Sequence, residues 1–143
     1  MTALTADRNT PEKSSLENVG LLGASQAIFI GSILMRNASG HLIEGATATG
    51  SFGAGRAEAR GASTTAGVTA QPYRAGVHRF ANSASGDLIV TADIGAACYI
   101  VDDQTVAKTS ASATRSPAGI IDGVDAQGVW VRFDEALTRA MLS

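Results

Sequence analysis

Short apolar runs separated by polar turn residues recur through most of the chain. A run at 27–30 is followed by another at 33–36, and the Asn-Ala-Ser-Gly cluster at 37–40 separates that second run from 41–44. Apolar runs of this length on either side of an Asn/Ser/Gly cluster are typical of strands joined by a turn. We therefore predict a β-hairpin in this part of the chain.

The second half of the chain carries the clearest strand pattern. Its last run alternates, so that Val129, Val131 and Phe133 fall on one face of a strand while Trp130 and Arg132 fall on the other. Closely spaced short strands with Gly, Asp, Asn and Ser between them predict an all-β fold, either a small barrel or a sandwich. The strand candidates lie at 77–80, 88–90, 97–101, 105–107, 118–121 and 128–133.

The two ends of the chain depart from this pattern. Residues 1–18 are polar and have no clear period, so we expect an extended arm, either frayed or ordered on a neighbouring subunit. Residues 134–143 contain helix formers with Asp134 at the N-cap position, and Leu137 and Met141 lie on one face. We predict a short C-terminal helix at 134–143 that follows a β-rich domain at 19–133.

Gly, Ala, Ser and Thr dominate residues 45–71. Small side chains bury little surface, and glycine costs backbone entropy to order, so we predict a long surface loop with a short strand or helix only around 56–60. Loops of this length are uncommon in compact domains and are often functional. Contact with another subunit and a simple solvated linker are both consistent with this composition.

Composition and charge narrow the function classes. The 143 residues are 45% hydrophobic but only 5% aromatic, which suits one folded domain with a thin core. Such a domain gains stability by burying surface against copies of itself or a partner. The net charge of −2, with arginines scattered along the sequence, argues against a nucleic-acid partner.

The sequence also argues against export and membrane insertion. A single cysteine, Cys98, excludes an intramolecular disulfide and suits assembly in the cytosol. The first residues lack a basic start followed by an apolar run, so we expect no signal peptide. The longest apolar stretch, 19–35, is interrupted by Gly, Ser and Gln, so we expect no membrane span and no membrane partner.

Residues that could carry chemistry are scarce. His41, His78 and Cys98 lack the spacing of a zinc site, and Cys98 lies in an apolar strand candidate where cysteine is usually inert. The acidic pair at 102–103 suits a turn better than a calcium loop, because the residues after it lack alternating oxygen ligands. The glycines of 50–55 lack the Gly-Lys-Ser/Thr ending of a phosphate-binding loop. We predict no enzyme activity, no metal and no cofactor.

One stretch resembles a known family. Residues 92–106 read ADIGAACYIVDDQTV, and a polar stretch, a Gly-containing strand at 116–122 and a final strand at 127–133 follow. This order and spacing resemble the capsid cement (head decoration) proteins of tailed bacteriophages. The hairpin at 31–44 resembles the start of their domain more loosely. The small-residue segment at 45–71 and the C-terminal helix depart from the family pattern.

The resemblance implies a structural role without catalysis. It implies a β-tulip-like domain, made in the host cytoplasm and placed on the outer surface of an icosahedral virion head. Its partners would be the major capsid protein and itself, as a homotrimer at threefold and quasi-threefold positions. Binding only to the assembled shell stabilises that shell by mass action, and many identical contacts add through multivalency.

We expect the arm and the 45–71 segment to contact the shell or neighbouring subunits, and the β-domain to form the trimer core. Tyr99 and Trp130 are either interface anchors or plain core aromatics. The alternative function is a carbohydrate- or cell-surface-binding β-module on the virion, although only three Trp and Tyr residues exist to build an aromatic platform. No residue set argues for a hydrolase. The candidate contact residues are Leu4, Leu16, Val19, Phe52, Arg56, Arg60, Tyr99 and Trp130.

Overall fold

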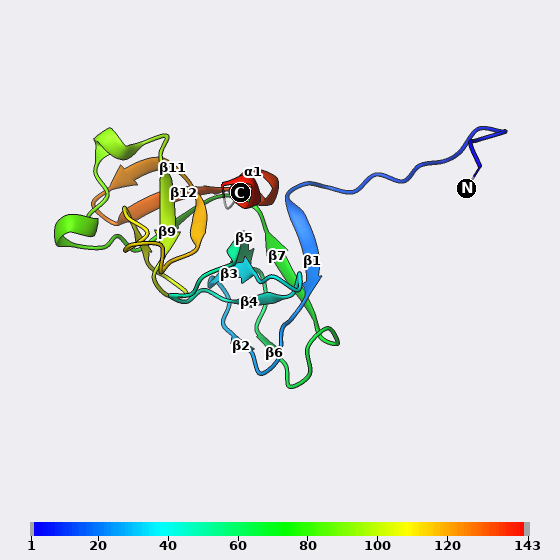
Figure 1. Ribbon diagram of the computed structural model, residues 1–143, viewed down its shortest axis with the longest axis horizontal. Coiled ribbons are helices and arrows are strands. Elements are labelled where there is room, and N and C mark those ends of the chain that lie inside the picture. The colour runs from blue at the N-terminus through cyan, green and yellow to red at the C-terminus, as the bar shows by residue number, and fades with distance from the viewer. Residues whose placement is uncertain (1, 142–143) are drawn as a thin grey trace.

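Two five-stranded sheets form the body of the protein in a computed structural model that describes residues 2–141 (Figure 1). The first sheet has the order β1 (Glu17–Leu21), β7 (Ala70–Arg74), β5 (Phe52–Ala57), β3 (Ile33–Arg36) and β4 (Leu42–Glu44). The second has the order β10 (Val106–Ala107), β9 (Ala97–Ile100), β11 (Pro117–Asp125), β12 (Gly128–Phe133) and β8 (Gly76–Phe80). The two short strands β2 (Ala27–Ile28) and β6 (Gly61–Ala62) form a third sheet.

Each of the two large sheets curls so strongly that a single bridge joins its own two edges. A parallel bridge joins Leu22, just after β1, to Leu42 in β4, and a second bridge joins Ala81, just after β8, to Thr105 beside β10. One bridge per sheet does not close a barrel. The prediction of an all-β fold with a short C-terminal helix is confirmed. Within residues 2–141, no helix is long and apolar enough to cross a membrane.

Strand β3 links the two cores of the molecule. Successive side chains of a strand point to opposite faces, so Ile33 and Met35 pack into the core of the second sheet while Leu34 packs into that of the first. All three side chains are fully buried. The hairpin of β3 and β4 that the sequence predicts is present, with Met35 opposite Ile43.

The prediction of a long surface loop at 45–71 is wrong, because this segment contains β5, a central strand of the first sheet. Its glycines and alanines are packed where large side chains would not fit. A Cβ atom on Gly53 would lie 2.7 Å from the carbonyl carbon of Ala118 in β11, and Ala54 and Ala57 are fully buried. Small residues are needed here because β5 and β11, from different sheets, touch through their backbones.

Strand β12 has the faces that its alternation predicts. Val129, Val131 and Phe133 are buried, while Trp130 and Arg132 are exposed. The Phe133 ring meets Phe80 of β8 edge to face, with ring centres 5.8 Å apart. The alternation of apolar and polar residues predicted these faces correctly because one face of β12 covers the core and the other faces solvent.

The apolar run at 88–90 does not form the strand that we predicted. It lies between two short 3-10 turns, η1 (Ser85–Asp87) and η2 (Thr91–Asp93). Ile89 is buried, and its backbone N–H and C=O both bond to the side-chain amide of Asn82, at 3.0 and 2.9 Å. This amide takes the place of a neighbouring strand, so no ladder forms.

The C-terminal helix α1 (Glu135–Ala140) begins as predicted, with Asp134 accepting a hydrogen bond from the Leu137 N–H at 3.1 Å. Its buried residue is Thr138, whereas Leu137 and Met141 remain partly exposed. The helix therefore packs through a polar face. Residues 142–143 of the predicted helix lie outside the described residues.

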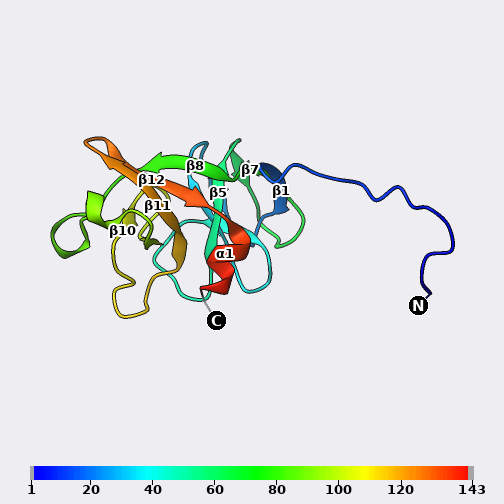
Figure 2. The same cartoon turned by 90° about the horizontal axis from the view of Figure 1, so that it is seen from above.

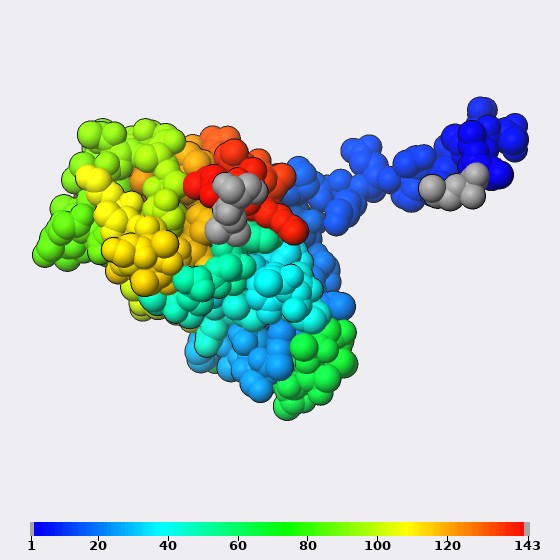
Figure 3. Space-filling model, viewed as in Figure 1, coloured from blue at the N-terminus to red at the C-terminus, as the bar shows by residue number. Residues whose placement is uncertain are grey.

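The N-terminal arm projects from the body of the molecule. Residues 2–16 form no helix or strand and extend away from the sheets (Figures 1 and 3). Strand β1 begins at Glu17, so the last two residues of the predicted arm, which ran from 1 to 18, belong to the first sheet. Residue 1 lies outside the described part of the chain.

Candidate functional site

The side chains that could bind a metal ion or act as a Cys–His pair lie apart in the described part of the chain. Within residues 2–141, no group of three or more His, Cys, Asp or Glu side chains is placed to hold a metal ion. Cys98 is fully buried in β9, and burial raises the pKa of its thiol to about 12. A thiol with this pKa stays protonated near neutral pH, so Cys98 is a core residue, as predicted, and not a nucleophile.

Both histidines occupy half-buried positions with structural neighbours. The Nε2 atom of His78 lies 3.2 Å from the Arg74 carbonyl oxygen and 3.0 Å from that of Ala75. This contact holds the bend at which the chain passes from β7 in the first sheet to β8 in the second. His41 lies against Gly67 in the turn before β7. Among residues 2–141, neither imidazole forms a hydrogen bond or an ion pair with Cys98 or with a carboxylate.

The arm and β1 present the most exposed of the predicted contact residues. Leu4 is 71% exposed and Val19 is 67% exposed. Leu16, at the base of the arm, is also largely exposed, and its side chain lies beside Gly76. Leu21 is exposed on β1 as well, and Val19 and Leu21 lie on the same face of this strand.

The contact residues predicted in 45–71 divide into one buried residue and two accessible ones. Phe52 is only 6% exposed and lies under the guanidinium of Arg139 in α1, so its prediction as a surface contact is wrong. Arg56 is half-buried and bonds Glu58 at 2.6 Å, while its Nε is buried without a hydrogen-bond partner. Arg60 is exposed and stacks over the ring of Phe29.

Neither Tyr99 nor Trp130 presents an open aromatic platform. Tyr99 is half-buried in β9. Trp130 is 37% exposed, and its Nε1 donates to the Asp125 carboxylate at 2.9 Å. The Arg79 guanidinium lies 5.3 Å above the centre of the indole ring, and the backbone of Gly123 lies beside the ring. Trp130 is therefore packed within its own sheet.

An open groove of about 640 Å³ runs along β8. It brings together Arg56 and Trp130, two of the predicted contact residues, whereas Leu4, Arg60 and Tyr99 lie elsewhere. The groove spans β8, with Arg56 of the first sheet among its lining residues and Gln127 and Trp130 of the β12 side among them as well. Its lining includes Arg56, Val77, Arg79, Phe80, Gln104 and Trp130.

An exposed apolar corner was missed by sequence reasoning. We interpreted 27–30 as a strand, but β2 ends at Ile28, and Phe29 and Ile30 are 58% and 67% exposed. The Ser32 N–H donates to the Phe29 carbonyl oxygen, and Gly31 has a φ of +87°. This is a tight turn, and the Gly-Ser pair directly after the apolar run was the signal that could have indicated it.

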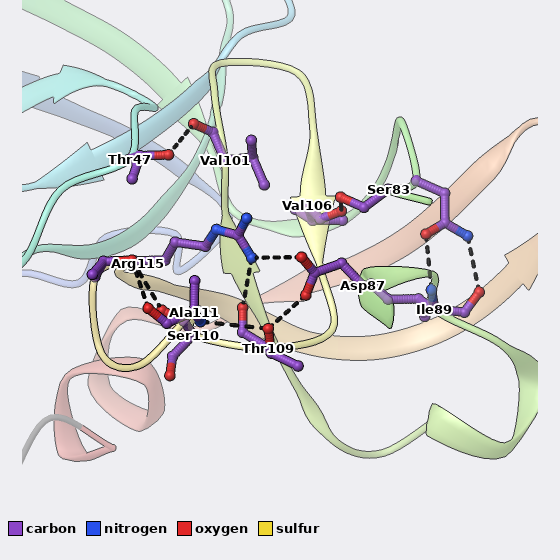
Figure 4. Close-up of polar contacts among 12 residues, drawn as sticks. Thr47, Ser83, Asp87, Ile89, Val101, Val106, Thr109, Ser110, Ala111 and Arg115 are labelled. Atoms are coloured by element: carbon purple, nitrogen blue, oxygen red, sulfur yellow. Dashed lines mark hydrogen bonds and ion pairs between the residues drawn. The ribbon is translucent and has the colours of Figure 1, made fainter. Parts of the chain in front are cut away.

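A polar network holds the loops at the far end of the second sheet (Figure 4). Asp87 accepts hydrogen bonds from the Thr109 hydroxyl at 2.5 Å and from the Arg115 guanidinium at 3.1 Å. These bonds, the one from Thr109 first, lower the pKa of the Asp87 carboxyl. Arg115 also donates to the Thr109 carbonyl oxygen, so the network closes on itself and fixes the loop without offering a vacant site.

A second network links α1 to the first sheet. Glu135 accepts from the Arg36 guanidinium at 2.8 Å and from the Tyr73 hydroxyl at 2.9 Å, and Arg36 also donates to Tyr73 at 2.7 Å. Burial, and then the nearby Glu135 carboxylate, raise the pKa of Tyr73 to about 12. The three side chains satisfy one another, so this cluster is structural.

Alkaline pH is expected to weaken this link. The Tyr73 pKa in the folded state lies above its ordinary value of 10.0, so the folded state holds this proton more tightly than the unfolded state does. The resulting stability is complete below about pH 10 and is lost as the pH rises toward about 12. Urea unfolding at about pH 8 and about pH 11 should show the loss, and Tyr73→Phe should reduce it. An equal loss in that variant would contradict the role of Tyr73.

Comparisons of the sequence with family models and with curated proteins, and of the structure with solved structures, found no match.

Proposed function

We propose that this protein is a capsid cement protein that binds the outer surface of an icosahedral phage head and fastens neighbouring major capsid proteins together. The observation that carries the proposal is the exposed arm of residues 2–16, which extends from a tightly packed β-domain (Figure 3). Within residues 2–141 no three or more His, Cys, Asp or Glu side chains are grouped so that they could hold a metal ion.

The arm has the physical properties of a segment that orders on a partner. Its side chains are exposed, including that of Leu4. A segment of this kind loses conformational entropy when it binds, but it can wrap a large surface on its partner. The exposed side chains of Leu4, Leu16, Val19 and Leu21 provide the area that would be buried, at about 25 cal/mol per Å². Repetition of the same contact over a lattice then multiplies a modest affinity.

The segment that resembles the cement family links the two large sheets of this fold. Residues 92–106 include the end of η2 and all of β9, and Ile100 is fully buried. At its acidic turn, the carbonyl oxygen of Asp103 accepts from the N–H of Ile33 in β3 at 2.7 Å. The segment therefore joins the second sheet to the first, a position in which its sequence is constrained by packing.

Co-sedimentation with undecorated phage heads tests the proposal. The purified full chain should pellet with the heads and remain in the supernatant without them. Leu4→Asp should weaken binding by about tenfold or more, because it places a charge where apolar surface would be buried. Thr5→Asp, which puts the same charge at the next position, should have a smaller effect.

Two outcomes would contradict this account. If the unchanged protein does not pellet with heads at any concentration tested, the cement function is wrong, and retention on a glycan array would then favour the carbohydrate-binding alternative. If the two arm variants bind equally well, Leu4 does not contribute to the contact. Circular dichroism of both variants checks that the β-domain is unchanged.

A further inference from the structure

We propose that the groove along β8 binds an extended acidic segment of a partner protein, which would pair with the open edge of β8 as an additional strand. The inference concerns a surface of the free protein, and its test uses no phage head, so it stands or falls independently of the cement function. It is carried by unpaired backbone groups of β8 and by two arginines with few hydrogen-bond partners, all of which line one groove.

Strand β8 is the outermost strand of the second sheet, beside β12 (Figure 2). Ala81, which directly follows β8, donates its N–H to the Gln104 carbonyl oxygen and accepts from the Val106 N–H, so its backbone groups point away from β12. Backbone groups alternate in direction along a strand, so those of Arg79 and Val77 point to the same side as those of Ala81. These residues all follow the positive-φ bend at the first residue of β8, so the bend does not interrupt the alternation between them.

The backbone groups of Val77 and Arg79 on this side have no partner strand. Within the described residues, β8 pairs only with β12, and no other backbone hydrogen bond involves Val77 or Arg79. Each of these two residues therefore offers one N–H and one C=O to a further strand. Gly31 and Arg56 line the groove on the side of the first sheet. An open strand edge of this kind is a template for an extended peptide.

The lining of the groove is cationic, although the whole chain has a net charge of −2. Arg56 and Arg79 both line it, and in the described part of the chain no Asp or Glu side chain does. A cleft lined by charge of one sign attracts ligands of the opposite sign. The charge of the groove therefore favours an acidic segment over a neutral or basic one.

Arg79 is only weakly paired by its acidic neighbour. Its ion pair with Asp125 has a length of 3.6 Å, and within residues 2–141 its guanidinium makes no hydrogen bond. The Asp125 carboxylate already accepts from the Trp130 Nε1 at 2.9 Å and from two backbone N–H groups of its own turn. Because Arg79 is 42% exposed, its N–H donors are available to a second carboxylate.

Arg56, on the first-sheet side of the groove, also has donors to spare. Among residues 2–141 its one hydrogen bond goes to Glu58 at 2.6 Å, and its Nε has no partner. Arg56 lies directly opposite Arg74 of β7, and like charges in such a pair repel each other. Arg74 has its own carboxylate partner in Glu17. A carboxylate bound in the groove would add negative charge beside Arg56.

The geometry of an antiparallel strand pair defines the segment that fits. The residue opposite Arg79 would exchange both backbone hydrogen bonds with it and would place its side chain on the same face, with Cβ atoms about 5 Å apart. An acidic side chain suits this position. Two residues further along the segment, the side chain lies opposite the half-buried Val77, where an apolar side chain suits. The predicted pattern is thus an acidic residue, any residue and an apolar residue in an extended stretch.

Peptide titration of the full chain tests the inference. The probe acetyl-Thr-Glu-Thr-Val-Thr-amide carries the acidic and apolar residues at the required spacing, and a matched peptide has Gln in place of Glu. Binding can be followed by the NMR shifts of the Val77 and Arg79 amides and by the fluorescence of Trp130, which lines the groove. The Gln peptide should bind about fivefold more weakly, because it loses a charge-assisted hydrogen bond.

Methylation of single peptide nitrogens tests the strand pairing. In the proposed register the N–H of the Glu residue faces β8, whereas the N–H of the central Thr faces away from it. Methylation of the Glu nitrogen should therefore weaken binding about tenfold or more, and methylation of the central Thr nitrogen should be tolerated. Equal effects of the two methyl groups would contradict the addition of a strand to β8.

Variants of the protein separate the groove from the rest of the surface. Arg79→Gln should weaken binding of the Glu peptide about fivefold and leave that of the Gln peptide nearly unchanged. Arg60→Gln removes the same charge at an exposed arginine outside the groove, so it should leave the binding of both peptides unchanged. Equal effects of the two substitutions would contradict a specific role for Arg79.

The outcomes of the titration decide the question. Preferential binding of the Glu peptide, with shifts centred on Val77 and Arg79, supports the proposal. Equal binding of the Glu and Gln peptides, or shifts confined to other residues, would overturn it. No binding of either peptide up to about 10 mM would overturn it too. If heparin shifts the Arg79 amide while neither peptide binds, the groove belongs to a polyanionic carbohydrate instead of a protein.

Discussion

Replacing Gly53 with alanine is expected to destabilise the protein by about 3 kcal/mol, a large part of the stability of an ordinary domain. The added methyl group would meet three backbone atoms of Ala118, including the carbonyl carbon at 2.7 Å and Cα at 2.9 Å. Backbone atoms cannot move aside as a flexible side chain can. The two sheets would have to separate along β5 and β11, and the contacts of both cores would loosen.

Gly86 offers a matched control for the same chemical change. A Cβ atom at this position would have no heavy atom within 4 Å, and its φ is not in the left-handed range. Gly86→Ala should therefore change the free energy of unfolding by only a few tenths of a kcal/mol. Urea denaturation of both variants gives the comparison. If Gly53→Ala were as stable as Gly86→Ala, β5 and β11 would not touch as described.

The same position explains why β5 could not be predicted from the sequence. A Gly/Ala-rich segment usually indicates a loop, because small side chains bury little surface. At Gly53 the absent side chain is what allows a second sheet to approach, and that sheet contributes Ala118, which lies 65 positions later in the sequence. Information about a contact partner so distant in the chain is not contained in the local pattern.

Elements whose signals are local were predicted correctly. The hairpin of β3 and β4 has its turn residues between its strands, and α1 has its N-cap in Asp134. Short apolar runs bounded by turn residues were enough to predict strands β9 and β12. The run at 88–90 has the same composition but gains its hydrogen bonds from Asn82, and no local pattern separates these cases.

The candidate contact surface was predicted less completely than the fold. Exposure of Leu4 and Val19 follows from a polar arm and an edge strand, and both were expected. Phe52 was placed at the surface because its neighbours are small, but Arg139 of the distant helix α1 covers it. The exposure of Phe29 and Ile30 was not predicted, because apolar residues in a short run usually indicate a buried strand.

Replacing Val131 with glutamine is expected to destabilise the protein by about 4 kcal/mol, whereas the same residue at the neighbouring position 132 should cost no more than about 1 kcal/mol. Val131 is fully buried in the core of the second sheet. A glutamine there exceeds the available volume and buries an amide among apolar side chains without hydrogen-bond partners. Arg132 points to solvent, and its substitution removes only an exposed ion pair with Asp122.

Because the two positions are adjacent, the comparison tests the register of β12 as well as its burial. A shift by one residue exchanges the faces of a strand, so the larger cost would then fall on Arg132→Gln. Unfolding can be followed by far-UV circular dichroism and by the fluorescence of Trp130, the only tryptophan in the sequence. Similarly small losses in both variants would mean that neither face of β12 covers a core, and similarly large losses would mean that both faces are buried. A loss confined to Val131→Gln would place the buried face of β12 at Val129, Val131 and Phe133, opposite the face on which Trp130 contacts Arg79.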